Sequence, residues 1–290
     1  MSPPVPWSAA LITRPTFIQL YGDDRGRARP PGAPNESPTM VANSLTERDP
    51  LAQIRSQTAA VIPAYQDEKH IGDIVRRVRQ QLDHVLVVDD GSTDQTAQRA
   101  REAGAEVIVH NQNRGKGEAI KTGLGYWFAM ANPSRRTAGR LDQEIMWVSL
   151  LDSDGQHLPE EIDRFLAAVT SATRPTFLIG NRMNNVTAMP LIRRIVNRYM
   201  SGRISRLCGQ AIPDTQCGFR MVDRQLVPEL LGGGDRFEYE TEVLIIASRK
   251  GYRIESVPIT TVYSDQVSKI HPMRDAIRFL KLMWRYRKAA

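Results

Sequence analysis

Two carboxylates and an amide alternate with other residues in the segment 146–159, which reads MWVSLLDSDGQHLP. Asp152, Asp154 and Gln156 offer three hard oxygen ligands, the kind that Mg²⁺ or Mn²⁺ prefers when it accompanies a phosphate-bearing substrate. The apolar run before them stops at Asp152, which predicts a buried parallel strand whose carboxyl end opens onto a site. The same residues also fit a polar turn before a helix over 158–172, so the rest of the chain has to decide.

Other predicted strands also end in polar groups. AAVIPAY predicts a buried strand that ends near Tyr65, HVLVVDD predicts a second that ends in Asp89 and Asp90, and AEVIVH predicts a third. Helical periodicity at 71–78 and 94–103 separates them, which predicts a parallel sheet with right-handed crossovers. Because the carboxyl ends of parallel strands lie at one edge of a sheet, these groups together predict a nucleotide pocket with a metal beside it.

The loop NRGKG, at 113–117, precedes a long predicted helix. It lacks the GxxxxGK[ST] spacing of a P-loop, and the chain has no GxGxxG dinucleotide motif. Both absences argue against kinases and dehydrogenases.

Composition limits the classes of partner. The chain has 290 residues, 41% of them hydrophobic, and a net charge of +7, which indicates one main α/β domain and anionic partners: nucleotides, lipid phosphates, a membrane surface or nucleic acid. Its two cysteines, Cys208 and Cys217, have no metal-ligand spacing and fit a reducing cytoplasm. No apolar run reaches membrane-spanning length, and no signal-peptide pattern begins the chain. We therefore expect a cytoplasmic protein, soluble or peripheral at the membrane.

The pattern divides the chain into three parts. Residues 1–56 are Pro-rich and predicted to be disordered, with Met40 as an alternative start. Residues 57–265 carry the α/β pattern, and 266–290 carry a basic amphipathic helix.

Six motifs in order give the chain a family resemblance. VIPAYQDE, VVDDGSTDQT, NRGKGEAIKTG, LDSDGQ, GNRM and DTQCGFRM resemble the family 2 glycosyltransferases of GT-A fold, most closely the dolichyl- and polyprenyl-phosphate mannosyl- and glucosyltransferases. The resemblance covers about 57–270. It implies a single catalytic domain with a mostly parallel, Rossmann-like sheet flanked by helices.

The resemblance also implies roles for individual residues. Those implied to hold the nucleotide sugar are Pro63, Tyr65, Asp67, Asp90 and Asp152, with Lys116 or Arg114 nearby. Those implied to bind the metal and diphosphate are Asp152, Asp154 and Gln156, and those implied to meet the reacting phosphates are Arg182 and Arg193 or Arg194. One departure is PAYQDE where the family has PAYNEE, which puts the shorter Asp67 where Glu is expected.

The chemistry of such a transfer is inverting. A metal ion and nearby Arg or Lys offset the charge that develops on the diphosphate leaving group. A lipid-phosphate acceptor is already anionic and needs no general base, whereas a hydroxyl acceptor needs one. Asp214 is then the first candidate and Glu240 the second. Asp214 also fits a cap or turn carboxylate, and Glu240 fits a residue that orients a loop or pairs with Arg.

Two further segments carry apolar and basic residues at helical spacing. In 190–208 the apolar stripe predicts a helix packed on the sheet, while its many Arg residues suit phosphate. The segment 273–287 fits either a helix lying on an anionic membrane or a solvated face on a packed helix. Before it, the Ser-Lys segment at Lys269 resembles a segment that in some relatives closes over the sugar donor.

Three other classes remain to be weighed. A nucleotidyltransferase needs a Gly-rich basic loop after the first strand, which VIPAYQDE lacks. A non-catalytic nucleotide-sugar-binding protein would have no need of both Asp152 and Asp154. Nucleic-acid binding is disfavoured because the Arg residues are not interleaved with aromatic platforms.

Overall fold

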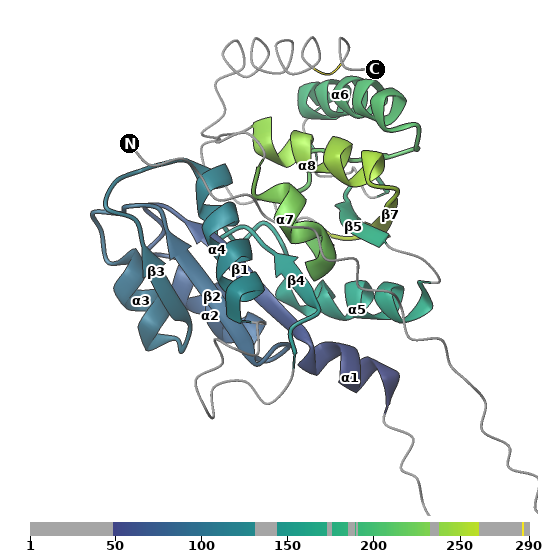
Figure 1. Cartoon of the computed structure of the whole chain (residues 1–290). Coiled ribbons are helices and arrows are strands. Elements are labelled where there is room, and N and C mark those ends of the chain that lie inside the picture. Colours follow the sequence, from purple (N-terminus) through teal and green to yellow (C-terminus); the bar gives the residue numbers. More distant parts are fainter. Residues whose placement is uncertain are drawn as a thin grey trace, which may run out of the picture. The chain divides into compact units, whose positions relative to one another are not determined.

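The computed structural model describes residues 49–130, 144–172, 176–184, 189, 191–232, 238–260 and 286. A seven-stranded sheet of order β3-β2-β1-β4-β6-β5-β7 runs through this part of the chain (Figure 1). The strands are β1 (Thr58–Ala64), β2 (His84–Asp89), β3 (Glu106–Val109), β4 (Trp147–Leu150), β5 (Thr176–Asn181), β6 (Arg220–Asp223) and β7 (Arg253–Pro258). The helices are α1 (Pro50–Ser56), α2 (Ile71–Arg79), α3 (Thr96–Glu102), α4 (Lys116–Met130), α5 (Ile162–Ser171), α6 (Leu191–Cys208), α7 (Val227–Leu230) and α8 (Glu238–Arg249), with 3₁₀ turns η2 (Pro159–Glu161) and η3 (Arg224–Leu226).

The sheet is mostly parallel, as the sequence predicts. β3, β2, β1 and β4 are parallel neighbours, and β5 is parallel to β7. β6 runs antiparallel to both β4 and β5. Because β6 is reversed, its first residue lies at the same edge as the last residues of β1, β4 and β5.

Helices on both sides of the sheet explain its continuous apolar strands. β1 is buried along its whole length, with Val61 and Ile62 fully inaccessible. Strands covered on both faces have apolar residues in succession and do not alternate with polar ones. Contacts divide the helices into two groups. One group consists of α1, α5, α2 and α3, with η2 between α5 and α2, and the other consists of α4, α7, α8 and α6. In Figure 1, α7 lies between α4 and α8.

α1 corrects the boundary predicted for the disordered extension. It lies within 1–56, yet its side chains Leu51 and Ile54 pack against the core. Asp49 caps it by accepting a hydrogen bond from the Leu51 amide at 3.0 Å, and Pro50 occupies the first turn, where its missing N–H costs nothing. Residues 1–48 lie outside the described part of the chain, as does the predicted helix 273–287 apart from Tyr286.

α6 corrects the prediction that its apolar stripe packs on the sheet. The side turned inward carries Asn197, Ser201, Ile204 and Cys208, and it is mostly polar or small. The stripe itself faces outward, with its large apolar side chains exposed. Those exposed side chains are Leu191, Ile192, Ile195, Val196 and Tyr199. Within the described ranges, no helix combines the length and the hydrophobicity that a membrane crossing needs.

Both cysteines are buried and form no disulfide. Burial raises the pKa of the Cys208 thiol to about 11 and that of the Cys217 thiol to about 12. The two thiols are therefore protonated at neutral pH.

α4 packs on β1 through a close approach at Gly123. The indole of Trp127 donates to the Ala60 carbonyl at 3.2 Å, which ties the helix to the strand. A methyl group at Gly123 would overlap the side chain of Val61, whereas one at Gly125 would meet only Leu231, at an ordinary 3.7 Å.

Gly123→Ala should therefore destabilise the protein, and Gly125→Ala should not. Alanine gains about 1 kcal/mol of helix propensity at either position. Overpacking against Val61 costs about 1–3 kcal/mol at Gly123 alone, so we expect Gly123→Ala to be about 1–3 kcal/mol less stable than Gly125→Ala and up to about 2 kcal/mol less stable than the unaltered chain. Urea unfolding of both variants measures the difference. Equal free energies of unfolding would contradict the packing described for α4.

Candidate active site

The polar strand ends meet at one edge of the sheet. The loops after β1, β4 and β5 leave from this edge, and the segment 214–219 enters it before β6. The strand order reverses between β1 and β4, and open α/β sheets bind ligands at such a reversal.

Asp152 belongs to a cluster of ion pairs at this edge. Lys116 Nζ, in the first turn of α4, lies 2.6 Å from Asp152 Oδ1 and 3.0 Å from Glu240 Oε1 on α8. Burial by itself would raise the pKa of Asp152, but the Lys116 charge outweighs it and lowers that pKa to about 2. Burial likewise opposes the charge on Lys116, yet the two carboxylates raise the pKa of Lys116 above its ordinary value. Asp152 and Lys116 are therefore both charged at neutral pH.

Asp154 has the opposite tendency. Burial raises its pKa, and the charges of Asp152 and Asp67 raise it further. Its Oδ1 accepts a hydrogen bond from the Gln156 amide at 3.0 Å, and Ser153 donates its hydroxyl hydrogen to Asp67. A cation bound beside Asp154 would relieve this repulsion.

The donor set fits a divalent cation that is coordinated both by the protein and by a diphosphate. No group of three or more His, Cys, Asp or Glu is arranged as a metal site among the residues that the structure describes. Mg²⁺ commonly takes one or two protein carboxylates and completes its shell with water and substrate phosphates. Asp152 and Asp154 can supply such a pair, and Gln156 is half-buried beside them.

Asp90 holds the NRGKG loop in place. Its Oδ1 accepts from the Arg114 amide at 2.9 Å and lies 2.7 Å from His110 Nδ1, while its Oδ2 accepts from the Gly115 amide at 2.7 Å. These bonds fix the start of α4 and therefore the position of Lys116. The role in holding the nucleotide sugar that the resemblance implies for Asp90 remains a prediction.

Asp214 and Arg182 form a buried pair. Asp214 Oδ2 accepts from Arg182 Nε at 2.7 Å and from the Arg182 amide at 3.1 Å; Oδ1 accepts from Arg182 Nη2 at 3.0 Å, Asn197 Nδ2 at 2.8 Å and the Gln216 amide at 3.2 Å. Burial alone would raise the pKa of Asp214, but the hydrogen bonds and charge of Arg182 lower it. A carboxylate with a lowered pKa is a weak base, so the geometry favours a role in positioning Arg182.

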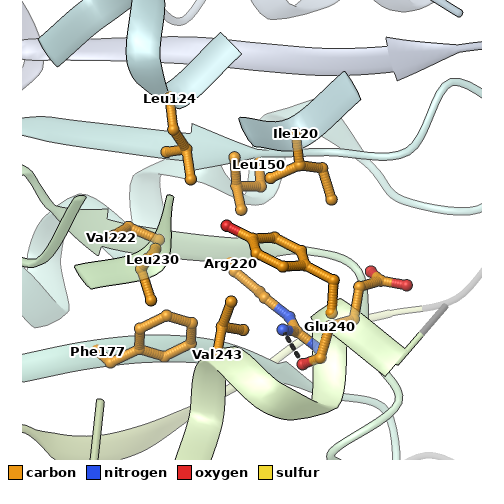
Figure 2. A pocket seen from close by; sticks show the side chains of 10 residues that line it. Ile120, Leu124, Leu150, Phe177, Arg220, Val222, Leu230, Glu240 and Val243 are labelled. Atoms are coloured by element: carbon orange, nitrogen blue, oxygen red, sulfur yellow. Dashed lines mark hydrogen bonds between the residues drawn. The ribbon is translucent and has the colours of Figure 1, made fainter. Parts of the chain in front are cut away.

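Two residues of the DTQCGFRM motif to which the sequence analysis gave no role, Arg220 and Gly218, shape the site. The fully buried Arg220 donates to the carbonyl oxygens of Thr215, Cys217 and Glu240, and Figure 2 shows the bond to Glu240 among apolar side chains. It ties the loop before β6 to α8. The sequence signals for Arg220 were its place in the DTQCGFRM motif and a charge inside the apolar run GFRMV.

Gly218 lets that loop approach Asp152. A Cβ at this position would lie 2.5 Å from Asp152 Oδ2, so any larger residue would have to displace the Asp152 carboxylate. Its letters alone do not distinguish it from an ordinary turn glycine.

The remaining predicted site residues lie in different surroundings. Pro63 is buried within β1, and the Tyr65 side chain is exposed at the same strand end. Arg193 lies in the first turn of α6, and none of the hydrogen bonds of the Arg182–Asp214 pair comes from it. His157, next to the acidic cluster, is buried with its Nε2 3.8 Å from Cys217 Sγ, and burial lowers its pKa to about 4.

Known proteins are similar to this chain in sequence. The chain is 29% identical to the UDP-N-acetylglucosamine–dolichyl-phosphate N-acetylglucosaminyltransferase of Methanococcus voltae, across 71% of this chain and 85% of that protein. It is 28% identical to the polyprenol monophosphomannose synthase of Mycolicibacterium smegmatis, across 70% of this chain and 77% of that protein.

A solved structure has the same fold. Glucosyl-3-phosphoglycerate synthase of Mycobacterium tuberculosis, crystallised with Mn²⁺, uridine diphosphate and phosphoglyceric acid, matches with a TM-score of 0.59 at 15% identity, over 82% of this chain and 81% of that one.

Residues 59–231 match the family described as Glycosyl transferase family 2. The chain therefore belongs to glycosyl transferase family 2, and it is a glycosyltransferase of GT-A fold.

Proposed function

We propose that the enzyme is metal-dependent and inverting, and that it moves a hexose from a UDP- or GDP-linked sugar to a polyprenyl phosphate at the cytoplasmic face of the membrane. The observation that carries the proposal is the acidic cluster at the sheet edge, where Asp152 and Asp154 lie beside Lys116. Two relatives are named for dolichyl phosphate and polyprenol monophosphomannose, which supports the acceptor class.

The charges at the site suit a nucleoside diphosphate. Asp152, Asp154 and Gln156 would hold Mg²⁺ or Mn²⁺, which as a Lewis acid would offset the charge on the leaving diphosphate. Lys116 adds a second positive charge at the start of α4, where the helix N-terminus also favours an anion. Pro63, Tyr65 and Asp67 remain our candidates for contacts to the nucleoside.

The state of Asp214 supports an acceptor that is already anionic. A hydroxyl acceptor needs a general base, but Asp214 is held by donors that lower its pKa, and Glu240 is paired with Lys116. A phosphate acceptor attacks without losing a proton. In this proposal Asp214 positions Arg182, whose guanidinium meets the acceptor phosphate, with Arg193 as a further candidate on α6.

Sugar transfer by the purified chain tests the function. Labelled UDP-glucose, UDP-N-acetylglucosamine, GDP-mannose and dTDP sugars are offered with a short polyprenyl phosphate and Mn²⁺ or Mg²⁺. We expect one donor to give a sugar-lipid. Release of the nucleotide without a lipid product would move the acceptor to a hydroxyl group, and neither product would return the chain to the non-catalytic binding class.

Asp154→Asn should lower the transfer rate by more than about a hundredfold, because losing one metal ligand removes several kcal/mol of charge stabilisation. The control is Asp73→Asn on α2, an exposed carboxylate whose ion pairs lie at the surface. Steady-state kinetics, together with melting curves that establish folding, measure the effect. Near-normal turnover in folded Asp154→Asn protein would reject the metal site.

Asp214→Asn should destabilise the fold at neutral pH by about 2 kcal/mol, because the buried carboxylate accepts charge-assisted hydrogen bonds from Arg182 that an amide does not fully replace. The folded-state pKa of Asp214 is lowered, so its stabilising contribution is complete above the ordinary value of 3.8 and is lost as the pH falls below that value. The difference between the unaltered chain and the variant should shrink accordingly.

Unfolding by urea at several pH values measures this difference. Asp163→Asn serves as the control because its pair with Arg55 is a surface ion pair, worth less than about 1 kcal/mol. A difference that does not depend on pH would show that the charge of Asp214 contributes little.

A further inference from the structure

α6 presents a large apolar face to solvent. The exposed fractions of its outward side chains are 68% for Leu191, 77% for Ile192, 59% for Ile195, 49% for Val196 and 60% for Tyr199. Buried residues occupy the opposite side of the helix, so this face has no part in the core. Contiguous apolar patches of this kind mark surfaces that bind a partner or a membrane.

Positive charge surrounds this face. α6 carries five arginines and no acidic residue. Those arginines are Arg193, Arg194, Arg198, Arg203 and Arg206. Arg194 and Arg198 also line an open groove of about 360 Å³ together with Leu191, Ile195 and Tyr199. The groove therefore combines apolar walls with guanidinium groups, which suit phosphate.

We propose that α6 docks on the surface of a bilayer that carries anionic headgroups. The apolar face enters the boundary between headgroups and acyl chains, and the arginines bind headgroup phosphates. The proposal rests on the proposed function only in placing the enzyme beside a lipid-borne acceptor. It assigns a membrane surface to a helix within the catalytic domain.

The charges favour a bilayer over a second copy of this chain. A two-fold contact of α6 with itself would bring arginines against arginines, and α6 has no carboxylate to pair with them. An anionic surface instead neutralises all of these charges and accepts the apolar side chains at the same time.

The inward side of α6 connects this surface to the active site. Asn197 donates to Asp214, and the Ser201 hydroxyl accepts a hydrogen bond from the Thr215 amide at 2.9 Å. Arg182 is therefore fixed to the side of α6 opposite the docking face, about 10 Å away across one helix. Docking would hold Arg182 at a constant depth from the headgroups.

Co-sedimentation of the full chain with vesicles tests the apolar part. We expect Ile192→Glu/Ile195→Glu to weaken binding to vesicles of phosphatidylcholine and phosphatidylglycerol by about tenfold or more, because two inserted side chains become charged. The control, Val109→Glu/Phe128→Glu, changes two exposed apolar side chains on β3 and α4 and should bind as the unaltered chain does. Matching melting curves establish that both variants are folded.

A second pair of variants tests the charges. Arg198→Gln/Arg203→Gln should reduce the preference for anionic over pure phosphatidylcholine vesicles by about thirtyfold at low salt, because each of the two basic residues near an anionic surface contributes about 1 kcal/mol. Arg99→Gln/Arg101→Gln removes two charges from α3 and should keep that preference.

Unchanged vesicle binding by both α6 variants would overturn the proposal. So would a dimer of the unaltered chain that the Glu variant dissociates without loss of vesicle binding, since the face would then join two copies. Transfer to a short polyprenyl phosphate in detergent separates this proposal from the proposed function. Absence of transfer together with α6-dependent vesicle binding would reject the function and leave docking intact.

Discussion

The structure depends on how it compensates carboxylates that the strand ends bring into a partly buried edge. Asp90 is compensated by two backbone amides and His110, Asp214 by Arg182 and Asn197, and Asp152 by Lys116. Desolvating a charge is costly unless hydrogen bonds or an opposite charge make up for it. Asp154 differs from these carboxylates, because burial and its acidic neighbours raise its pKa. If a metal ion binds as proposed, Asp154 is the carboxylate whose charge it would compensate.

The reversed strand β6 allows so many groups to meet. It lies between two strands of the opposite direction, so its first residues enter the edge where the others end. Gly218 then brings the backbone against Asp152, and Arg220 joins the same loop to α8. Glu240 reaches Lys116 from α8. In a purely parallel sheet only the ends of strands would reach this edge. The start of β6, whose Arg220 joins the preceding loop to α8, would then lie at the opposite edge.

Elements with a local apolar pattern could be predicted from the sequence. The buried strands, the helix at Ile71 to Val78 and the mostly parallel sheet are confirmed, because each depends on periodicity that the core enforces. The apolar stripe of α6 was placed wrongly. Periodicity finds a stripe but cannot say which side is buried when the inward side is held by hydrogen bonds, as it is at Asn197 and Ser201.

Hydrogen-bond partners could not be predicted from the sequence either. No sequence pattern indicates that Asp214 is saturated by donors or that Arg220 donates to three carbonyl groups, because these partners come from segments that only the fold brings together.

The burial of Cys208 and Cys217 has a practical consequence. Buried, protonated thiols react slowly with maleimides, so a cysteine introduced on the surface could be labelled selectively without removing the native pair. The natural chain is thus a ready background for fluorescence or spin-label spectroscopy.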